Sequence, residues 1–270
     1  MLKRHKIAVL GYGAIAQQLL QQLQHSANAQ TYEFAVLLRP ESARRALVPK
    51  GVVTLDSQQD LLAWQADLVV EAAGQRAVHE YVPACLQAGL TVLISSIGAL
   101  ADAQLYAHLI AQAQQGGGRI RLPSGAIGAL DYLRAASRLP GTQVKYESRK
   151  PVKAWQQELQ QLGHQPDSLD QAITLFSGSA DEAAQRYPQN LNVAAALALA
   201  GVGMEQTKVE VIADPQVSQN QHILHVSGPA GELSTHIRNH PSPENPKTSM
   251  LVAYSLLDAV ERQFDIVGFA

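Results

Sequence analysis

The chain has 270 residues, of which 46% are hydrophobic and 16% charged, and its formal net charge at pH 7 is -2. With this balance, the protein has no strong positive electrostatic field that would attract nucleic acid or a membrane surface, so we expect neither as a partner. The length allows two domains of ordinary size. No apolar run is long enough to span a membrane and no secretory leader is recognisable, which predicts a cytoplasmic protein.

The first apolar segment, Ile7 to Leu10, leads directly into a Gly-x-Gly-x-x-Ala turn and then a helical stretch. Gly11 permits the tight turn, Gly13 lets the backbone approach a pyrophosphate, and Ala16 lets the helix pack on the strand. The pattern predicts a dinucleotide-binding turn, with a plain strand-to-helix turn as the alternative. The residues predicted to bind the cofactor here are Gly11, Gly13, Ala14 and Ile15.

The second apolar segment, Phe34 to Leu38, ends at Arg39 instead of the acidic residue that is typical of NAD-preferring sites. Arg44 and Arg45 follow within a few residues. A guanidinium suits a 2′-phosphate, with which it forms charge-assisted hydrogen bonds. We therefore predict that Arg39 binds the cofactor and that the cofactor is NADP, or NADP and NAD alike. The alternative is a solvated basic loop.

Apolar strands alternate with helices as far as about Leu122, which predicts a doubly wound parallel sheet of the Rossmann type. The expected strands are Ile7–Leu10, Phe34–Leu38, Gly51–Leu55, Leu68–Glu71, Thr91–Ser95 and Arg119–Leu122. The expected helices are Ala14–Gln24, Leu61–Trp64, Ala77–Ala88 and Ala101–Gln115. Ala73 and Gly74 follow the fourth strand, at the edge where such sheets bind ligands, and are predicted to contact the cofactor. Tight helix–strand packing explains these small residues nearly as well.

The only cysteine, Cys85, excludes an intramolecular disulfide. It lies in an apolar helical pattern with no candidate base beside it in sequence. We expect a buried, inert thiol and no metal site.

After Pro123 the pattern changes to strands gathered together with helices between them, which predicts an α+β domain on a mixed or antiparallel sheet. The expected strands are Gln143–Lys150, Lys208–Ile212, Gln221–Val226 and Leu233–Asn239, and the expected helices are Ala180–Tyr187, Leu191–Leu199 and Ser249–Phe264. We expect the last helix to pack back on the first domain. The predicted domains are 1–123, completed by about 245–270, and 124–244.

Four segments of the second half carry a recognisable pattern. They are Pro123 to Asp131, Arg149 to Pro151 with Ala154-Trp155, Phe176 to Ala180 running on to Pro188 to Ala195, and Asn245 to Ser249. Together, in this order, they resemble the L-aspartate dehydrogenase family over essentially the whole chain. The resemblance implies hydride transfer from L-aspartate to NAD(P), giving iminoaspartate. That product hydrolyses to oxaloacetate and ammonia or feeds NAD biosynthesis.

The resemblance further implies that Ala126 and Asn192 contact the cofactor and that His222 is the active-site histidine. A structural glycine turn and a helix N-cap remain the alternatives for the first two. The substrate would be a dicarboxylic amino acid, and its carboxylates need cationic partners. We predict Lys247 and Thr248 for this role, with loop support as the alternative, and give Arg149 and Lys150 less weight.

Histidine is common in this part of the chain, since His225, His236 and His240 lie close to His222. Strand alternation predicts that His222 and Leu224 share one face and that His225 lies on the other, without choosing between the faces. Only the resemblance selects His222. A neutral imidazole with an ordinary pKa of about 6.5 accepts a proton and can activate water.

Two other functions stay open at this stage. One is a related two-domain NAD(P) reductase, such as a homoserine or dihydrodipicolinate-type reductase, which typically uses a lysine for acid–base catalysis. The other is a non-catalytic NADPH-sensing protein. The strand-rich second domain offers a surface for a homodimer, which we expect.

Overall fold

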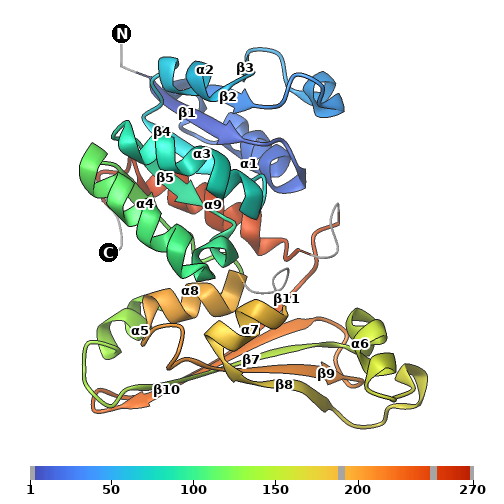
Figure 1. Ribbon diagram of the computed structural model, residues 1–270. Helices are drawn as coiled ribbons and strands as arrows, with labels where there is room; N and C mark the ends of the chain where they lie inside the picture. Colours follow the sequence, from blue (N-terminus) through green and yellow to red (C-terminus); the bar gives the residue numbers. More distant parts are fainter. Residues whose placement is uncertain (1–3, 188–191, 244–247, 268–270) are drawn as a thin grey trace. The chain divides into compact units, whose positions relative to one another are not determined.

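The computed structural model describes residues 4–187, 192–243 and 248–267 (Figure 1). These residues form two compact units, one made of 4–125 with 252–267 and the other of the described part of 126–251. No helix within the described ranges has the length and apolar character that a membrane span requires.

The first unit contains a parallel sheet of six strands in the order β3-β2-β1-β4-β5-β6. The strands are β1 (His5–Leu10), β2 (Tyr32–Leu37), β3 (Val53–Leu55), β4 (Leu68–Glu71), β5 (Thr91–Ile94) and β6 (Arg119–Arg121). The helices are α1 (Ala14–His25), α2 (Gln58–Ala63), α3 (Gln75–Gln87) and α4 (Ala103–Gly116). The strand order reverses between β1 and β4, and in doubly wound sheets ligands bind beyond the carboxyl ends of the strands at such a point. The predicted doubly wound sheet is confirmed.

The core of this unit forms because helix α1 carries apolar residues at helical spacing and β1 is apolar throughout. The fully buried residues of α1 are Ala16, Leu19, Leu20 and Leu23. They belong to the same core cluster as Ile7 and Val9 of β1, and as Leu256 and Val260 of the last helix, α9 (Leu251–Arg262). Burial of each leucine, isoleucine or valine side chain among them contributes roughly 1.5–3 kcal/mol. The predicted return of the last helix to the first core is confirmed.

The second unit contains a five-stranded sheet in the order β11-β10-β7-β9-β8. The strands are β7 (Gln143–Pro151), β8 (Ile173–Ser179), β9 (Lys208–Asp214), β10 (Asn220–Gly228) and β11 (Gly231–Asn239). Strands β7 and β9 pair in parallel and the other neighbours are antiparallel, so the sheet is mixed. Strand β8 was not expected. It is an edge strand that ends in Ser-Gly-Ser and has a bulge between Thr174 and Phe176, so it lacks a regular alternation of apolar residues.

Figure 1 shows helices along one side of this sheet. They are α5 (Leu130–Ala136), α6 (Gln156–Gln161), α7 (Ala180–Arg186) and α8 (Asn192–Ala200). Burial therefore alternates along the strands: Val144, Tyr146 and Ser148 of β7 are buried, whereas the residues between them are less buried. We call the first side the helix-covered face and the second the open face.

Candidate functional site

Gly11 ends β1 in a backbone conformation that favours glycine, with φ at +83°. A Cβ atom placed here would lie 2.6 Å from the Cβ of Ala73, and the Gly11 N–H donates to the carbonyl of Leu37. No other residue type fits without moving the backbone after β4. The structure therefore brings the two predicted cofactor-binding turns, at Gly11 and at Ala73, into direct contact.

Gly13 precedes helix α1, and no side chain caps the amide groups of its first turn. Such amides and the helix dipole together form an anion site, which is what a pyrophosphate requires. Ala14 and Ile15 form the start of the helix and are half-buried. A Cβ on Gly13 would lie 3.0 Å from an Nη atom of Arg44, so a guanidinium already lies over this turn. The residues present fit a bound dinucleotide.

The turn after β4 is organised by Glu71, a fully buried carboxylate. Its Oε1 accepts the N–H groups of Ala73 and Gly74, each at 2.8 Å, while Ser96 donates its N–H at 2.9 Å and its hydroxyl at 3.0 Å to the carboxylate. Gly74, at φ +111°, then starts helix α3. We did not predict a role for Glu71 from the sequence. A charged residue that ends an apolar strand is the signal that would have revealed it.

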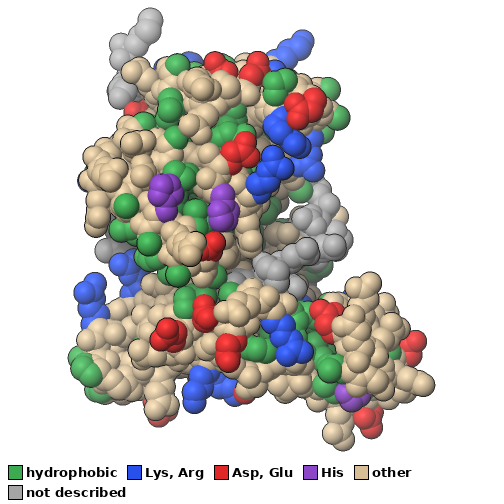
Figure 2. Space-filling model, in the orientation of Figure 1, with side chains coloured by type: hydrophobic (Ala, Val, Ile, Leu, Met, Phe, Trp, Pro, Cys, Tyr) green, Lys and Arg blue, Asp and Glu red, His purple; other side chains and the backbone are tan. Residues whose placement is uncertain are grey.

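Basic side chains follow β2, and Lys and Arg side chains gather on the face of the first unit that Figure 2 shows. Arg39 is exposed, with its Nε 3.5 Å from Glu41. Arg45 is held by Asp56 at 2.6 Å and by the carbonyl of Leu38 at 3.3 Å. Arg44 is exposed and has no ion pair with any described residue. Of the basic residues after β2, Arg44 thus has its guanidinium nearest the glycine turn, a placement the sequence did not predict.

In the second unit, His222 lies on β10 and is only 9% exposed, on the helix-covered face with Leu224. Its Nδ1 lies 2.7 Å from the hydroxyl oxygen of Tyr146 on the neighbouring strand, and the two rings stack. His225 is exposed on the open face and bonds to Ser234. The predicted separation of the two histidines onto opposite faces is confirmed, and burial distinguishes them where the sequence pattern did not.

Burial and, to a smaller extent, the positive charge of Lys150 together lower the pKa of His222 to about 4. An ordinary imidazole pKa was expected from the sequence, and that expectation was wrong for the protein without substrate. The difference arises because the sequence does not show which face the helices cover.

Arg149 and Lys150 are adjacent in sequence, but strand alternation places their side chains on opposite faces of the sheet. Arg149 lies on the open face, where its guanidinium bonds to Asp214 at 2.7 Å and to Glu147 at 3.3 Å. Lys150 lies on the helix-covered face, with its Nζ 5.2 Å from the centre of the Trp155 ring. Burial lowers the pKa of Lys150 to about 8, and the charge of Glu158 opposes this shift.

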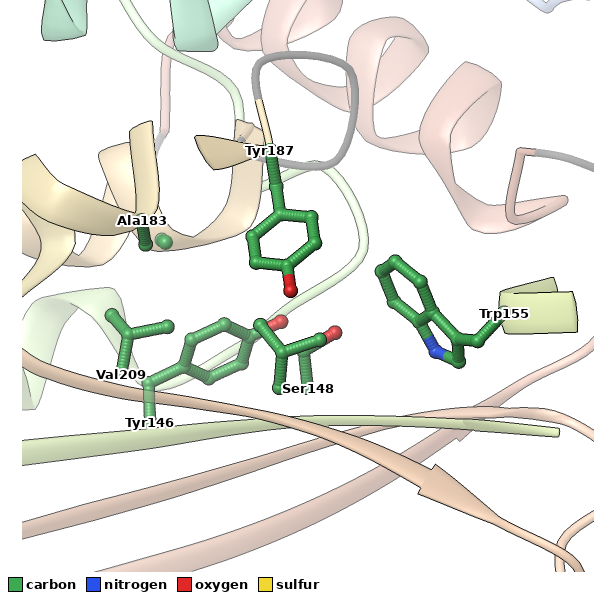
Figure 3. Close-up of a pocket in the computed structure, with 8 residues that line it drawn as sticks. Tyr146, Ser148, Trp155, Ala183, Tyr187 and Val209 are labelled. Carbon is green, nitrogen blue, oxygen red and sulfur yellow. The ribbon is translucent and has the colours of Figure 1, made fainter. Parts of the chain in front are cut away.

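A pocket lies on the helix-covered face, between the sheet and the helices above it (Figure 3). Its cavity volume is about 10 Å³, about enough for a single water molecule. Its lining residues are Tyr146, Ser148, Trp155, Ala183, Tyr187, Ala194, Val209 and Val211. Tyr146, whose hydroxyl contacts His222, is one of them, so the pocket adjoins the buried histidine. We did not predict this pocket from the sequence.

The remaining predicted residues are distributed as follows. Ala126 is buried, and its carbonyl accepts the amide of Asn239 at 2.8 Å. Asn192 is the first residue of helix α8 and is exposed, and Thr248 is half-buried with its carbonyl bonded to Ser242. Lys247 lies outside the described residues. None of these observations tests a binding role, so the roles of all four stay predictions.

Cys85 is fully buried in helix α3 and forms no disulfide, and burial raises the pKa of its thiol to about 12. The expectation of a buried thiol is confirmed, and such a thiol is inert as a nucleophile.

Comparison with known proteins gives one consistent result. Residues 131–263 match the family model described as aspartate dehydrogenase, C-terminal, and residues 11–123 match that of the homoserine dehydrogenase NAD binding domain. The chain is 52% identical to L-aspartate dehydrogenase 2 of Bordetella pertussis over 96% of both chains, and 37% identical to L-aspartate dehydrogenase of Methanosarcina barkeri over 95% and 96%. The crystal structure of aspartate dehydrogenase from Thermotoga maritima has a TM-score of 0.78 and 29% identity, covering 99% of this chain and 100% of that one.

Proposed function

Because the chain belongs to the L-aspartate dehydrogenase family, we propose that it catalyses the NAD(P)-dependent oxidative deamination of L-aspartate. Hydride leaves Cα for the cofactor, the amine loses a proton, and iminoaspartate forms. Water then converts the imine to oxaloacetate and ammonia. The observation that carries the proposal is the near-complete match to curated relatives of this activity, joined to a dinucleotide turn and a buried histidine in the two units.

The first unit holds the dinucleotide in this proposal. The amides at the start of α1 bind the pyrophosphate, with Gly11 and Gly13 giving it room and Ala14 and Ile15 providing N–H groups. Ala73 and Gly74, fixed by Glu71, form the surface along which the nicotinamide half passes. Ala126 and Asn192 are proposed as further contacts of the second unit. When bound, NAD(P) supplies the hydride acceptor.

His222 is the proposed acid–base group. If its Nδ1–H donates to the hydroxyl oxygen of Tyr146, the lone pair of Nε2 stays available to accept a proton from the substrate amine. The low pKa keeps the imidazole neutral in the free protein. Carboxylates of a bound substrate would stabilise the imidazolium and raise this pKa toward neutrality. After it releases this proton to solvent, the neutral imidazole can accept a proton from the water that attacks the imine.

The substrate is the dicarboxylic amino acid aspartate, and Lys247 and Thr248 are proposed to bind one of its carboxylates. For the adenosine end, Arg39 is proposed to bind the 2′-phosphate of NADP, with Arg44 beside it. A role in NAD biosynthesis and a cytoplasmic location both stay predictions.

The experiment is a steady-state screen of the purified chain with L-aspartate, homoserine and alanine, each with NAD and NADP, following the appearance of reduced nicotinamide. We expect turnover of aspartate alone. Turnover of homoserine would instead favour the related reductases, whose NAD-binding family model also matches this chain. Binding of reduced cofactor without turnover of any substrate would favour a sensing protein.

We also propose that the chain forms a homodimer through the open face of the second sheet. This face carries charged pairs, with Lys145 3.1 Å from Glu210 and Arg149 2.7 Å from Asp214, and Ile223 lies among them on β10. In a two-fold interface, a charged side chain of one copy would lie opposite a side chain of opposite charge in the other copy. Light scattering should give twice 29.1 kDa, and Ile223→Glu should give the monomer. A monomeric wild-type chain would contradict the proposal.

A further inference from the structure

A fully buried carboxylate lies at the carboxyl edge of the parallel sheet in the first unit. It belongs to Glu71, the last residue of β4, whose exposed fraction is 0%. Three backbone N–H groups and one hydroxyl donate to it, and all four donors are neutral. Burying a charge among neutral donors costs free energy that an apolar side chain would avoid. The charge itself is therefore a candidate for a function at this edge.

The hydrogen bonds of this carboxylate join two neighbouring turns. Ala73 and Gly74 belong to the turn after β4, whereas Ser96 follows β5, and the four donor atoms lie 2.8 to 3.0 Å from the carboxylate oxygens. The main chain adds a link, since the N–H of Ser95 donates to the carbonyl of Glu71 at 3.1 Å. Strands β4 and β5 are parallel neighbours, and doubly wound sheets bind ligands at the carboxyl ends of their strands. Glu71 therefore holds two turns at the edge that receives the cofactor.

The turn after β4 separates the buried charge from the surface by about one peptide group. Ala73 is exposed, while its N–H donates inward to Oε1 of Glu71 at 2.8 Å. A Cβ atom on Gly11 would lie 2.6 Å from the Cβ of Ala73, so this turn also adjoins the dinucleotide turn. A ring that rests on Ala73 would lie near the carboxylate. Because water is excluded around the carboxylate, its charge is screened less than that of a surface residue.

We propose that Glu71 is a positioning residue that holds these two turns and, through its buried negative charge, makes the protein favour the oxidised dinucleotide over the reduced one. This inference rests on the proposed path of the nicotinamide half along Ala73 and Gly74. The nicotinamide ring is positively charged when oxidised and neutral when reduced, so a nearby carboxylate stabilises only the oxidised form. Oxidation of aspartate consumes the oxidised dinucleotide and releases the reduced one. The charge of Glu71 thus favours binding of the first and release of the second.

Glu71→Gln tests the charge, because it removes the charge and preserves the size of the side chain and one of its oxygens. The dissociation constants of the oxidised and reduced dinucleotides are measured by calorimetry on the purified protein without substrate. Weaker hydrogen bonds to the turns affect both forms alike, so the ratio of the two constants isolates the charge. We expect the ratio of the Kd of the oxidised form to that of the reduced form to rise roughly tenfold. An unchanged ratio in the folded variant would overturn the proposed role of the charge.

Two further variants separate charge from position. Glu33→Gln removes an exposed carboxylate of β2 in the same unit, and both dissociation constants should keep their wild-type values. Ser96→Ala removes the hydroxyl donor and keeps the charge of Glu71, so both constants should rise together by about threefold or more with an unchanged ratio. Thermal melting identifies a variant that fails to fold. If Glu71→Gln fails, Ser96→Ala decides: wild-type values of both constants, or a changed ratio, would overturn the inference.

These binding measurements need no turnover, so they separate the role of Glu71 from the proposed activity. A wild-type protein that binds both forms of the dinucleotide and does not oxidise aspartate would refute the proposed function, while the ratio of the two constants would still test Glu71. A wild-type protein that binds neither form would overturn the inference. A ratio that rises in Glu71→Gln and stays at the wild-type value in Glu33→Gln and Ser96→Ala supports it.

Discussion

His222 and His225 lie three residues apart on one strand, and strand alternation places one among buried side chains and the other at the surface. Burial makes the first a neutral base that is bonded to Tyr146, whereas the second retains access to water and bonds to Ser234. Arg149 and Lys150 show the same separation one strand away. At the scale of single residues, the side of the sheet decides the chemistry available to each side chain.

The first prediction concerns the acid–base group. His222→Ala should lower kcat for aspartate oxidation by roughly 10²- to 10⁴-fold, the range for losing a positioned general base. Dinucleotide affinity, measured by fluorescence titration of the reduced cofactor, should stay near the wild-type value because Gly11 and Gly13 belong to the other unit. The control is His225→Ala, which should keep full activity. Loss of activity in His225→Ala but not in His222→Ala would show that the catalytic histidine lies on the other face of the strand.

The pH dependence of stability follows from the same imidazole. Its folded pKa of about 4 lies below the ordinary 6.5, so the unfolded chain binds more protons between these values. This contribution to the free energy of unfolding is therefore fully present above about pH 6.5 and is lost as the pH falls toward 4, amounting to about 3 kcal/mol for a pKa difference of this size. Urea titrations across this window should show a smaller loss in His222→Gln. An equal loss in both proteins would contradict a buried neutral imidazole.

The basic segment after β2 gives a second residue-scale prediction. Arg39→Asp and Arg44→Asp should each weaken NADP binding by roughly 10- to 100-fold and leave NAD binding nearly unchanged, because a charge-assisted bond to the 2′-phosphate is lost. The matched control is Arg45→Asp, since Arg45 is already paired with Asp56. Equal losses for the two dinucleotides in Arg39→Asp would reject its role at the phosphate.

At the scale of elements, the turn from β1 into α1 was predictable because its function needs small residues at fixed spacing. The strands of the first sheet were predictable for a related reason, since strands covered on both sides are apolar throughout. Strand β8 was missed because an edge strand with a bulge needs no apolar alternation. The pocket was missed because Trp155 and Tyr187, far apart in sequence, meet only through the sheet and helices between them.

Gly11 tests the turn as an element. Gly11→Ala combines a strained φ of +83° with a Cβ 2.6 Å from that of Ala73, so we expect it to lower stability and abolish measurable dinucleotide binding. Gly51 has a similar φ of +87° but open space around its missing Cβ, so Gly51→Ala isolates the backbone strain, about 1 kcal/mol. Thermal melting and cofactor titration of the two variants separate strain from contact. Equal behaviour of both would show that the contact with Ala73 has no role.

At the scale of the whole molecule, the chemical groups are divided between two compact units. The first provides a dinucleotide site at the switch point of a parallel sheet, and the second provides a buried histidine and a donor-lined pocket on one sheet face. Family membership joins the two into one activity. The family and both fold classes could be predicted from the sequence because they rest on local patterns. The cations that bind the substrate could not be predicted, because their placement depends on long-range packing that local patterns do not encode.

The specificity for a dicarboxylic amino acid is tested most directly by the ratio of kcat/KM for L-aspartate to that for L-alanine, measured on the wild-type protein with NADP and NAD in turn. A site built for two carboxylates leaves its cationic groups unpaired when the side-chain carboxylate is missing, so it should discriminate by roughly 10⁴ or more. We expect this ratio with either cofactor, and we expect glutamate, which is longer, to be a poor substrate as well. Comparable values for aspartate and alanine, or no aspartate turnover with either cofactor, would contradict this specificity.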